Sequence, residues 1–83
     1  MRTFILQNEQ IEFLKKMYQN ESIVQKVLVC EKSGVFTVDT ETKIDFMDFV
    51  EDESVAWMDE NYEPSENTLM LESIRDSIYY QTN

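Results

Sequence analysis

The charged residues of this chain are divided unevenly along its length, and this division constrains how the chain can fold. Residues 1–43 carry six acids and six bases, whereas residues 44–83 carry eleven acids and the single base Arg75. The whole net charge of -10 therefore lies in the second half. Self-repulsion among like charges opposes folding. Because 83 residues make one domain and no Pro, Gly or Ser-rich linker separates the halves, we interpret them as two faces of one small acidic domain, residues 1–83.

The composition lacks the residue types that most catalytic and cofactor sites require. The chain has no histidine, so Ser-His-Asp, Cys-His and histidine-containing metal sites are excluded. One glycine, Gly34, is too few for a loop that cradles phosphate. Paired carboxylates are abundant, but such a small chain offers little cleft in which to raise the pKa of one of them. We therefore expect no enzymatic activity and no cofactor.

Charge and hydropathy also limit the compartment and the class of partner. An excess of acids argues against direct binding to nucleic acid or to anionic lipid. The longest apolar run after the first residues is 27–30, too short to span a membrane, and the start lacks the apolar stretch of a secretory signal. Cys30 has no partner for an internal disulfide, and its apolar neighbours predict a small core residue. We expect a cytoplasmic protein that does not bind membranes.

Apolar spacing in the first half predicts an α+β fold. Asn8 can cap a helix over residues 8–20, in which Ile11, Leu14 and Tyr18 recur at helical spacing. The apolar residues 3–6 before it form either a short strand or a segment that packs on that helix.

Residues 22–40 are ambiguous, and we favour a β-hairpin across 23–40. The segment is rich in β-branched residues on both sides of the turn pair Ser33 and Gly34. Against this, Ser22 and Gln25 resemble a capping box and apolar residues repeat at helical spacing, with Gly34 as a C-terminal cap. If that segment is helical, the fold becomes nearly all-α.

The second half predicts two helical segments with an acidic face. From residue 44 to 62 the apolar period is helical, and its apolar side opposes the acids Asp45, Asp48, Asp52, Asp59 and Glu63. The three consecutive acids 51–53 repel one another in mid-helix, so a break into two shorter helices near 51–54 is an alternative to one continuous helix. Pro64 ends this region, and Ser65 can cap a C-terminal helix over 66–81 with the apolar stripe Leu71, Ile74 and Ile78.

Two features of this region have competing interpretations. Asp59, Asn61 and Glu63 alternate like the opening of a calcium loop, but Pro64 and Met70 stand where that loop needs glycine and a bidentate glutamate. We therefore predict no metal site. Trp57 is either the centre of the core or, if exposed, an anchor for a partner, and we favour the core.

The run of acids without bases between residues 44 and 74 is the main functional signal. If the acids served only to keep the protein soluble, lysines could be interspersed among them to relieve the repulsion, and the first half of the chain does contain lysines. We therefore predict a protein-interaction module whose carboxylates dock on a basic groove of a partner and mimic nucleic acid, which would make it an inhibitor. The alternative is an accessory or assembly domain that acts through an apolar dimer or partner surface. The predicted partner-binding residues are Asp45, Asp48, Asp52, Asp59, Glu60, Tyr62, Glu63 and Glu66.

Overall fold

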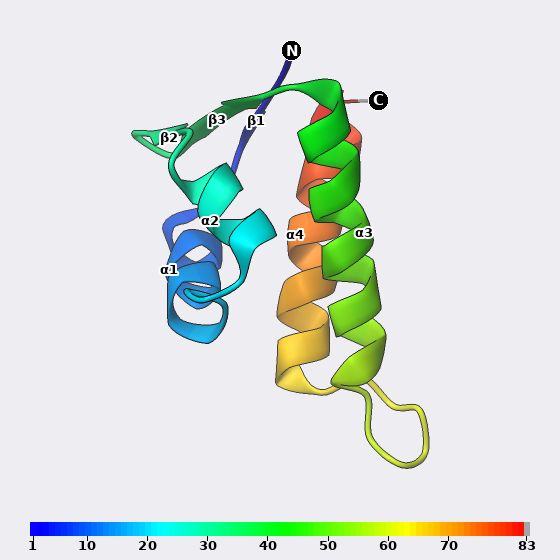
Figure 1. The fold of residues 1–83 in the computed structure, drawn as a ribbon. Coiled ribbons are helices and arrows are strands. Elements are labelled where there is room, and N and C mark those ends of the chain that lie inside the picture. Colours follow the sequence, from blue (N-terminus) through cyan, green and yellow to red (C-terminus); the bar gives the residue numbers. More distant parts are fainter. Residues whose placement is uncertain (83) are drawn as a thin grey trace.

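The computed structural model describes residues 1–82 and confirms a small α+β domain. It contains four helices and a three-stranded antiparallel sheet, and the strands are interleaved with the helices along the chain (Figure 1). The elements are β1 (Arg2–Ile5), α1 (Asn8–Met17), α2 (Ser22–Leu28), β2 (Glu31–Lys32), β3 (Val35–Val38), α3 (Thr40–Ala56) and α4 (Glu66–Thr82). Within residues 1–82, no helix combines the length and hydrophobicity that crossing a membrane requires.

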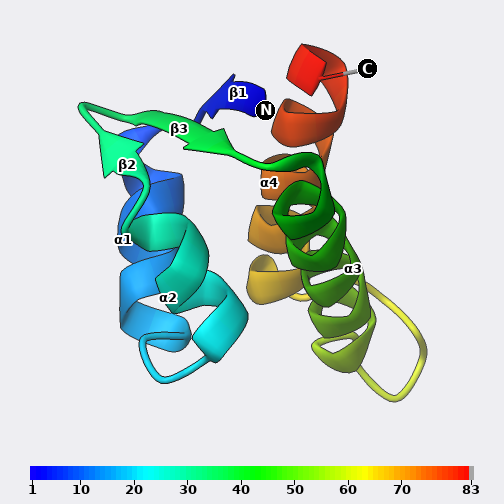
Figure 2. The ribbon, with the colours of Figure 1, turned by 45° about the horizontal axis from the view of Figure 1, so that its top comes forward.

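The helices form two pairs, and the sheet lies across one end of both. The α1 and α2 pair stands beside the antiparallel α3 and α4 pair, with the strands above them (Figure 2). The core fills the space between the pairs and under the sheet, where Phe46 and Val50 of α3 meet Leu71 and Ile74 of α4, all of them fully buried. Burial of these side chains removes apolar surface from water, which is the main favourable contribution to folding.

The sheet is held by its central strand β3, which pairs with β1 on one side and β2 on the other. Phe4 and Phe36 face each other in register and stack with ring centroids 5.2 Å apart. The turn from β2 to β3 is formed by Ser33 and Gly34, with φ of 56° and 83°. Positive φ at both central residues is typical of the type I′ turn, whose twist suits a hairpin. The predicted turn is thus confirmed, and of the two alternatives left open for residues 3–6 the structure shows the short strand, β1.

The first arm of the predicted hairpin is wrong, because residues Ser22–Leu28 form α2 instead. Val24 and Val27, three residues apart, are fully buried, and this helical packing outweighs the weak strand preference of valine. The cap position is Glu21, not Ser22. Cys30 follows the end of this helix and is exposed, so its prediction as a core residue is also wrong. The hairpin is therefore confined to residues 31–38.

The helix bounds differ from the sequence prediction at several ends. Helix α1 starts after Gln7, whose backbone N–H donates to the Gln10 side chain at 2.8 Å, so Asn8 is not the cap. Helix α3 runs from residue 40 to 56 and not from 44 to 62, and it passes without a break through 51–54. Consecutive side chains do not face each other on a helix, so the three acids there diverge. Glu51 and Asp52 are exposed and Glu53 is half-buried, while Val50 and Ser54 are buried.

Candidate functional site

Helix α3 presents a straight row of exposed carboxylates on the side away from the core. Asp39 caps the helix, because its carboxylate accepts hydrogen bonds from the backbone and side chain of Thr42, and these bonds hold the pKa of Asp39 below its usual value. The helix consequently begins four residues earlier than predicted and includes one further acid. Steps of four, three and four residues keep the acids on one face of the helix. We call this row the α3 stripe: Glu41, Asp45, Asp48 and Asp52.

The negative charge of the α3 stripe is not neutralised within the part of the chain that the structure describes. None of its four carboxylates makes an ion pair with a residue in the range 1–82. Arg75, the base of the second half, pairs instead with Asp76 at 3.0 Å and Glu72 at 3.8 Å on α4. Exposed charges that lack an ion-pair partner are not neutralised locally, and a groove of opposite charge can compensate them.

Residues 57–65, which we call the acidic loop, project from the end of α3 and are organised by Asp59. One carboxylate oxygen of Asp59 accepts the backbone N–H groups of Asn61 at 2.8 Å and Glu63 at 2.9 Å. The backbone N–H of Tyr62 donates to the Asp59 carbonyl at 3.0 Å. This closes a tight turn in which Tyr62 adopts φ of 61° and leaves its side chain 82% exposed. The turn therefore presents an aromatic side chain to solvent in a preformed conformation.

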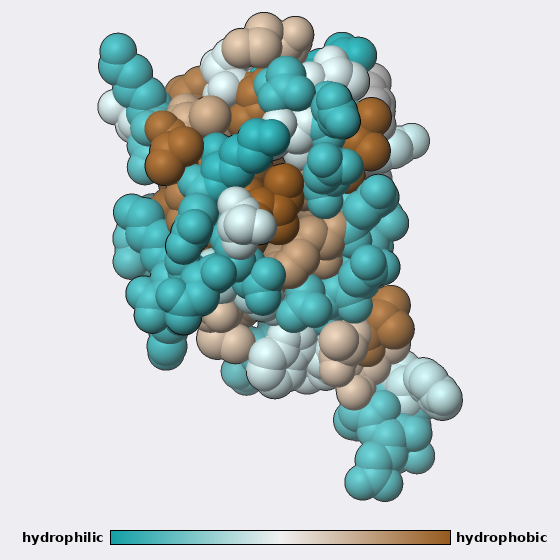
Figure 3. All heavy atoms as spheres, in the orientation of Figure 1, coloured by the Kyte–Doolittle hydropathy of each residue, from teal (hydrophilic) through white to brown (hydrophobic). Residues whose placement is uncertain are grey.

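The eight predicted partner-binding residues are all exposed, and they fall into three groups. Asp45, Asp48 and Asp52 lie on the α3 stripe, and Glu66 is the first residue of α4. The acidic loop between these helices carries the other four, and hydrophilic residues cover it where it projects at the lower right of Figure 3. These four residues are Asp59, Glu60, Tyr62 and Glu63. The acids thus follow α3, the connecting loop and the first residue of α4, and Asp59 and Glu63 do not share a helix face as predicted.

The alternating oxygens of the acidic loop serve its own backbone. Asp59 Oδ1 is occupied by two N–H donors, an arrangement that orders the turn without an ion. Within residues 1–82 no group of three or more potential ligand side chains is placed to hold a metal ion.

Trp57 lies at the rim of the core, not at its centre as predicted. Its side chain is 40% exposed, and its indole N–H donates to the Tyr18 hydroxyl at 2.9 Å. Tyr18 also packs edge to face against Phe49 of α3, with ring centroids 5.2 Å apart. Burial raises the pKa of Tyr18 against the opposing effect of the Trp57 hydrogen bond. Trp57 thus ties the start of the acidic loop to the end of α1.

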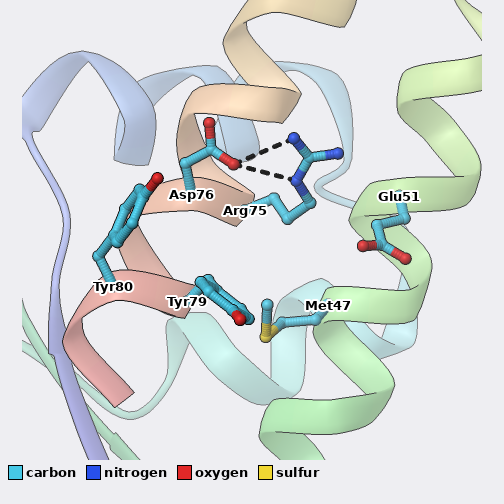
Figure 4. A pocket seen from close by; sticks show the side chains of 6 residues that line it. All are labelled: Met47, Glu51, Arg75, Asp76, Tyr79 and Tyr80. Carbon is cyan, nitrogen blue, oxygen red and sulfur yellow. Dashed lines mark hydrogen bonds and ion pairs between the residues drawn. The ribbon is translucent and has the colours of Figure 1, made fainter. Parts of the chain in front are cut away.

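A second feature, which the sequence analysis did not identify, is a groove of about 270 Å³ between α3 and α4. Met47 and Glu51 line it from α3, and Arg75 and Tyr79 face them from α4 (Figure 4). Each pair is spaced by four residues and so lies on one helix face. The helical period alone could have indicated each face, but only the antiparallel packing of the two helices brings them together. We call it the tyrosine groove: Met47, Glu51, Arg75, Asp76, Tyr79 and Tyr80.

Comparisons with protein-family models, with curated proteins and with solved structures find no match to this chain.

Proposed function

We propose that the protein is an interaction module that inhibits a larger, nucleic-acid-handling protein by occupying a basic groove of that partner. The observation that supports this most directly is the α3 stripe, whose four exposed carboxylates lack ion-pair partners among residues 1–82. Neighbours in the stripe lie about 5–6 Å apart, because helix positions three or four residues apart are surface neighbours. A regular row of negative charges is also what a basic groove meets along a nucleic-acid backbone.

The length of the α3 stripe suits this kind of mimicry. Eleven residues separate Glu41 from Asp52, which corresponds to about 16 Å along the helix axis at 1.5 Å per residue. That length equals the rise of about five nucleotides at 3.4 Å each. The acidic loop extends the row beyond the end of the helix with Glu60 and Glu63. The proposed contact is thus long enough to block a groove that holds a short stretch of one strand.

The proposal separates the charged contacts from an aromatic anchor. Exposed ion pairs contribute little affinity each, but a complementary field speeds the encounter of the partners. Tyr62 is exposed, and its backbone is held by the Asp59 turn, so that backbone loses little conformational freedom on binding. Tyrosine is among the residues enriched at energetically dominant contact positions. The proposal assigns no reaction to the protein, and its unpaired Cys30 suits the cytoplasm.

The test is capture of partners on the immobilised protein from a lysate of the cells that make it, followed by elution with duplex DNA or with salt. A partner held through its phosphate-binding groove is released by competing DNA and by raised ionic strength. The triple variant Asp45→Asn, Asp48→Asn and Asp52→Asn should lose this partner. A matched variant, Glu9→Gln, Glu12→Gln and Glu21→Gln, removes the same charge from exposed positions of the first half and should keep it. Equal capture by both variants would contradict the proposal.

The alternative function, assembly through an apolar surface, is favoured by one observation. Five large apolar or aromatic side chains of α3 and α4 are at least half exposed: Ile44, Val55, Leu69, Tyr79 and Tyr80. A homodimer through this face would bring two chains of charge -10 together, so salt would strengthen it by screening their repulsion. Sedimentation at low and high salt therefore separates the two functions, since charge-driven docking weakens under the same change.

A further inference from the structure

The tyrosine groove has a volume and a lining that suit one side chain of a partner better than a free ligand. Its volume of about 270 Å³ lies just below the range of about 300–1,000 Å³ typical of small-molecule pockets. The groove is open to solvent between two packed helices, and its walls are the Met47 thioether and the Tyr79 ring, with carboxylates at its edges (Figure 4).

The charges of the groove leave one carboxylate available. The Arg75 guanidinium reaches toward α3, but it donates to Asp76 Oδ1 at 3.0 and 3.2 Å (Figure 4). It also pairs with Glu72 at 3.8 Å. Glu51 faces it across the groove, and its side chain makes no hydrogen bond or ion pair with any residue in the range 1–82. With Glu51 and Asp76 negative and Arg75 positive, the lining has a net negative charge. An anionic group would meet that charge and the field of the whole acidic domain.

The aromatic wall distinguishes between the two basic side chains of proteins. Tyr79 is 53% exposed and stands edge to face against Tyr80, with ring centroids 5.8 Å apart. A planar, weakly hydrated guanidinium stacks on such a ring and donates two hydrogen bonds to one carboxylate. The compact, strongly hydrated ammonium of lysine makes neither contact as well.

We infer that the tyrosine groove binds an arginine side chain of the partner, with its guanidinium between the Tyr79 ring and the Glu51 carboxylate. This inference rests on the proposed function, because it assumes a partner with a basic surface. It adds a specific anchor beside the α3 stripe, on the neighbouring face of the same helix. The apolar stem of the arginine would lie along the Met47 side of the groove, and the available Glu51 carboxylate would set its charge preference.

The test is an NMR titration of the isotope-labelled protein with three small probes: N-acetylarginine amide, N-acetyllysine amide and N-acetylcitrulline amide. Citrulline has nearly the shape of arginine but no charge. We expect saturable shifts of the Met47 methyl and Tyr79 ring signals with the arginine probe, weaker binding of the lysine probe and no saturation with citrulline. Equal binding of citrulline and arginine, or shifts spread along the α3 stripe without saturation in the groove, would overturn the inference.

Two variants locate the binding. Glu51→Gln should weaken the arginine probe about tenfold or more, since charge-assisted hydrogen bonds are among the strongest in proteins. Glu51 is exposed and makes no side-chain contact of this kind, so the fold should persist. Glu9→Gln on α1 removes the same charge away from the groove and should leave the affinity unchanged. Equal loss in both variants would show a nonspecific field effect and overturn the inference.

The failure of this inference is distinguishable from failure of the proposed function. If the arginine probe fills the groove but the triple α3 stripe variant keeps its captured partner, the proposed function fails while the groove stands. If that variant loses the partner but the probe binds no better than citrulline, the groove fails while the proposed function stands.

Discussion

The junction between α3 and α4 depends on one buried hydroxyl, and its removal should destabilise the protein measurably. In a continuing helix the carbonyl of Ser54 would accept the N–H of Met58, but that N–H donates to Val55 at 3.1 Å. The Ser54 carbonyl accepts the Thr68 hydroxyl instead, at 2.9 Å, from the first turn of α4. Thr68 is fully buried, so water cannot replace this bond. A side chain of α4 therefore satisfies a backbone carbonyl at the end of α3 that has no helical donor.

Thr68→Val preserves the shape of the side chain and removes the hydroxyl. Leaving a buried carbonyl without a donor costs about 1–3 kcal/mol, whereas Thr68→Ser keeps the hydroxyl and loses one methyl, at about 0.8 kcal/mol plus a small cavity effect. We expect the valine variant to unfold first, with Tm lower than wild type by about 4–8 °C for each kcal/mol in a domain of this size.

The assay is urea and thermal unfolding followed by circular dichroism, with Thr37→Val as the control. Thr37 is exposed on β3, so its substitution should change the free energy of unfolding by less than about 0.5 kcal/mol. If Thr68→Val were as stable as wild type, or more stable than Thr68→Ser, the hydroxyl would contribute nothing beyond apolar burial. The account of the α3 end would then be wrong.

Three further predictions concern caps, titration and backbone strain. Asp39→Ala should lower the urea midpoint at neutral pH. Because the pKa of Asp39 is lowered in the folded state, its contribution is present above the unfolded pKa, and the difference from wild type should shrink as pH falls below about 4. Burial raises the pKa of Tyr18, so the stabilisation from its neutral side chain is fully present below about pH 10, the unfolded tyrosine pKa, and is lost as the pH rises above that value. Tyr18→Phe has no hydroxyl to ionise, so urea titrations should show that it loses less stability than wild type as the pH rises above about 10. At Tyr62, where φ is positive, the glycine variant should be more stable than the alanine variant by roughly 0.5–1 kcal/mol in thermal unfolding, and the opposite order would contradict a left-handed conformation there.

The parts of the fold that the sequence predicts well are those where local signals and packing agree. Ser65 caps α4 as predicted, since its hydroxyl accepts the Thr68 N–H at 3.2 Å. The stripe of Leu71, Ile74 and Ile78 is fully buried. In these segments the helical period, the cap and the preceding proline all indicate the same helix. When local signals agree in this way, a helix and its first residue can be predicted from the sequence.

The errors arise where a local preference competes with packing that the sequence does not display. Valine favours strands, yet Val24 and Val27 lie in a short helix because that places both against the core beside α3. The predicted end of α3 is wrong because the apolar period continues past Ala56, whereas the Asp59 carboxylate accepts hydrogen bonds from the backbone N–H groups of a turn. A carboxylate that bonds to nearby backbone competes with the helix, and this turn creates the acidic loop.

The candidate site likewise has one part that the sequence predicts, the α3 stripe, and one part that it does not, the tyrosine groove. Exposure of the α3 acids follows from the helical period alone, so the sequence predicted the α3 stripe apart from Glu41, whose inclusion depends on the cap at Asp39. The tyrosine groove could not be predicted, since Glu51 and Tyr79 belong to helices whose relative register is set by the core between them. Sequence therefore indicates the faces of single helices, and packing determines which faces meet.

The stripe and the loop should influence different rate constants of binding, and this gives the strictest test of the proposed division of roles. The carboxylates of Asp45, Asp48 and Asp52 are exposed and act at a distance, so their triple replacement by asparagine should lower the association rate constant and flatten its salt dependence. Tyr62 acts only after contact, so Tyr62→Gly should raise the dissociation rate constant and leave association nearly unchanged. Surface plasmon resonance with the captured partner at several salt concentrations measures both. If the acids changed mainly dissociation, they would be buried contacts in the complex and not a steering field, and mimicry of a solvated phosphate backbone would no longer describe the α3 stripe.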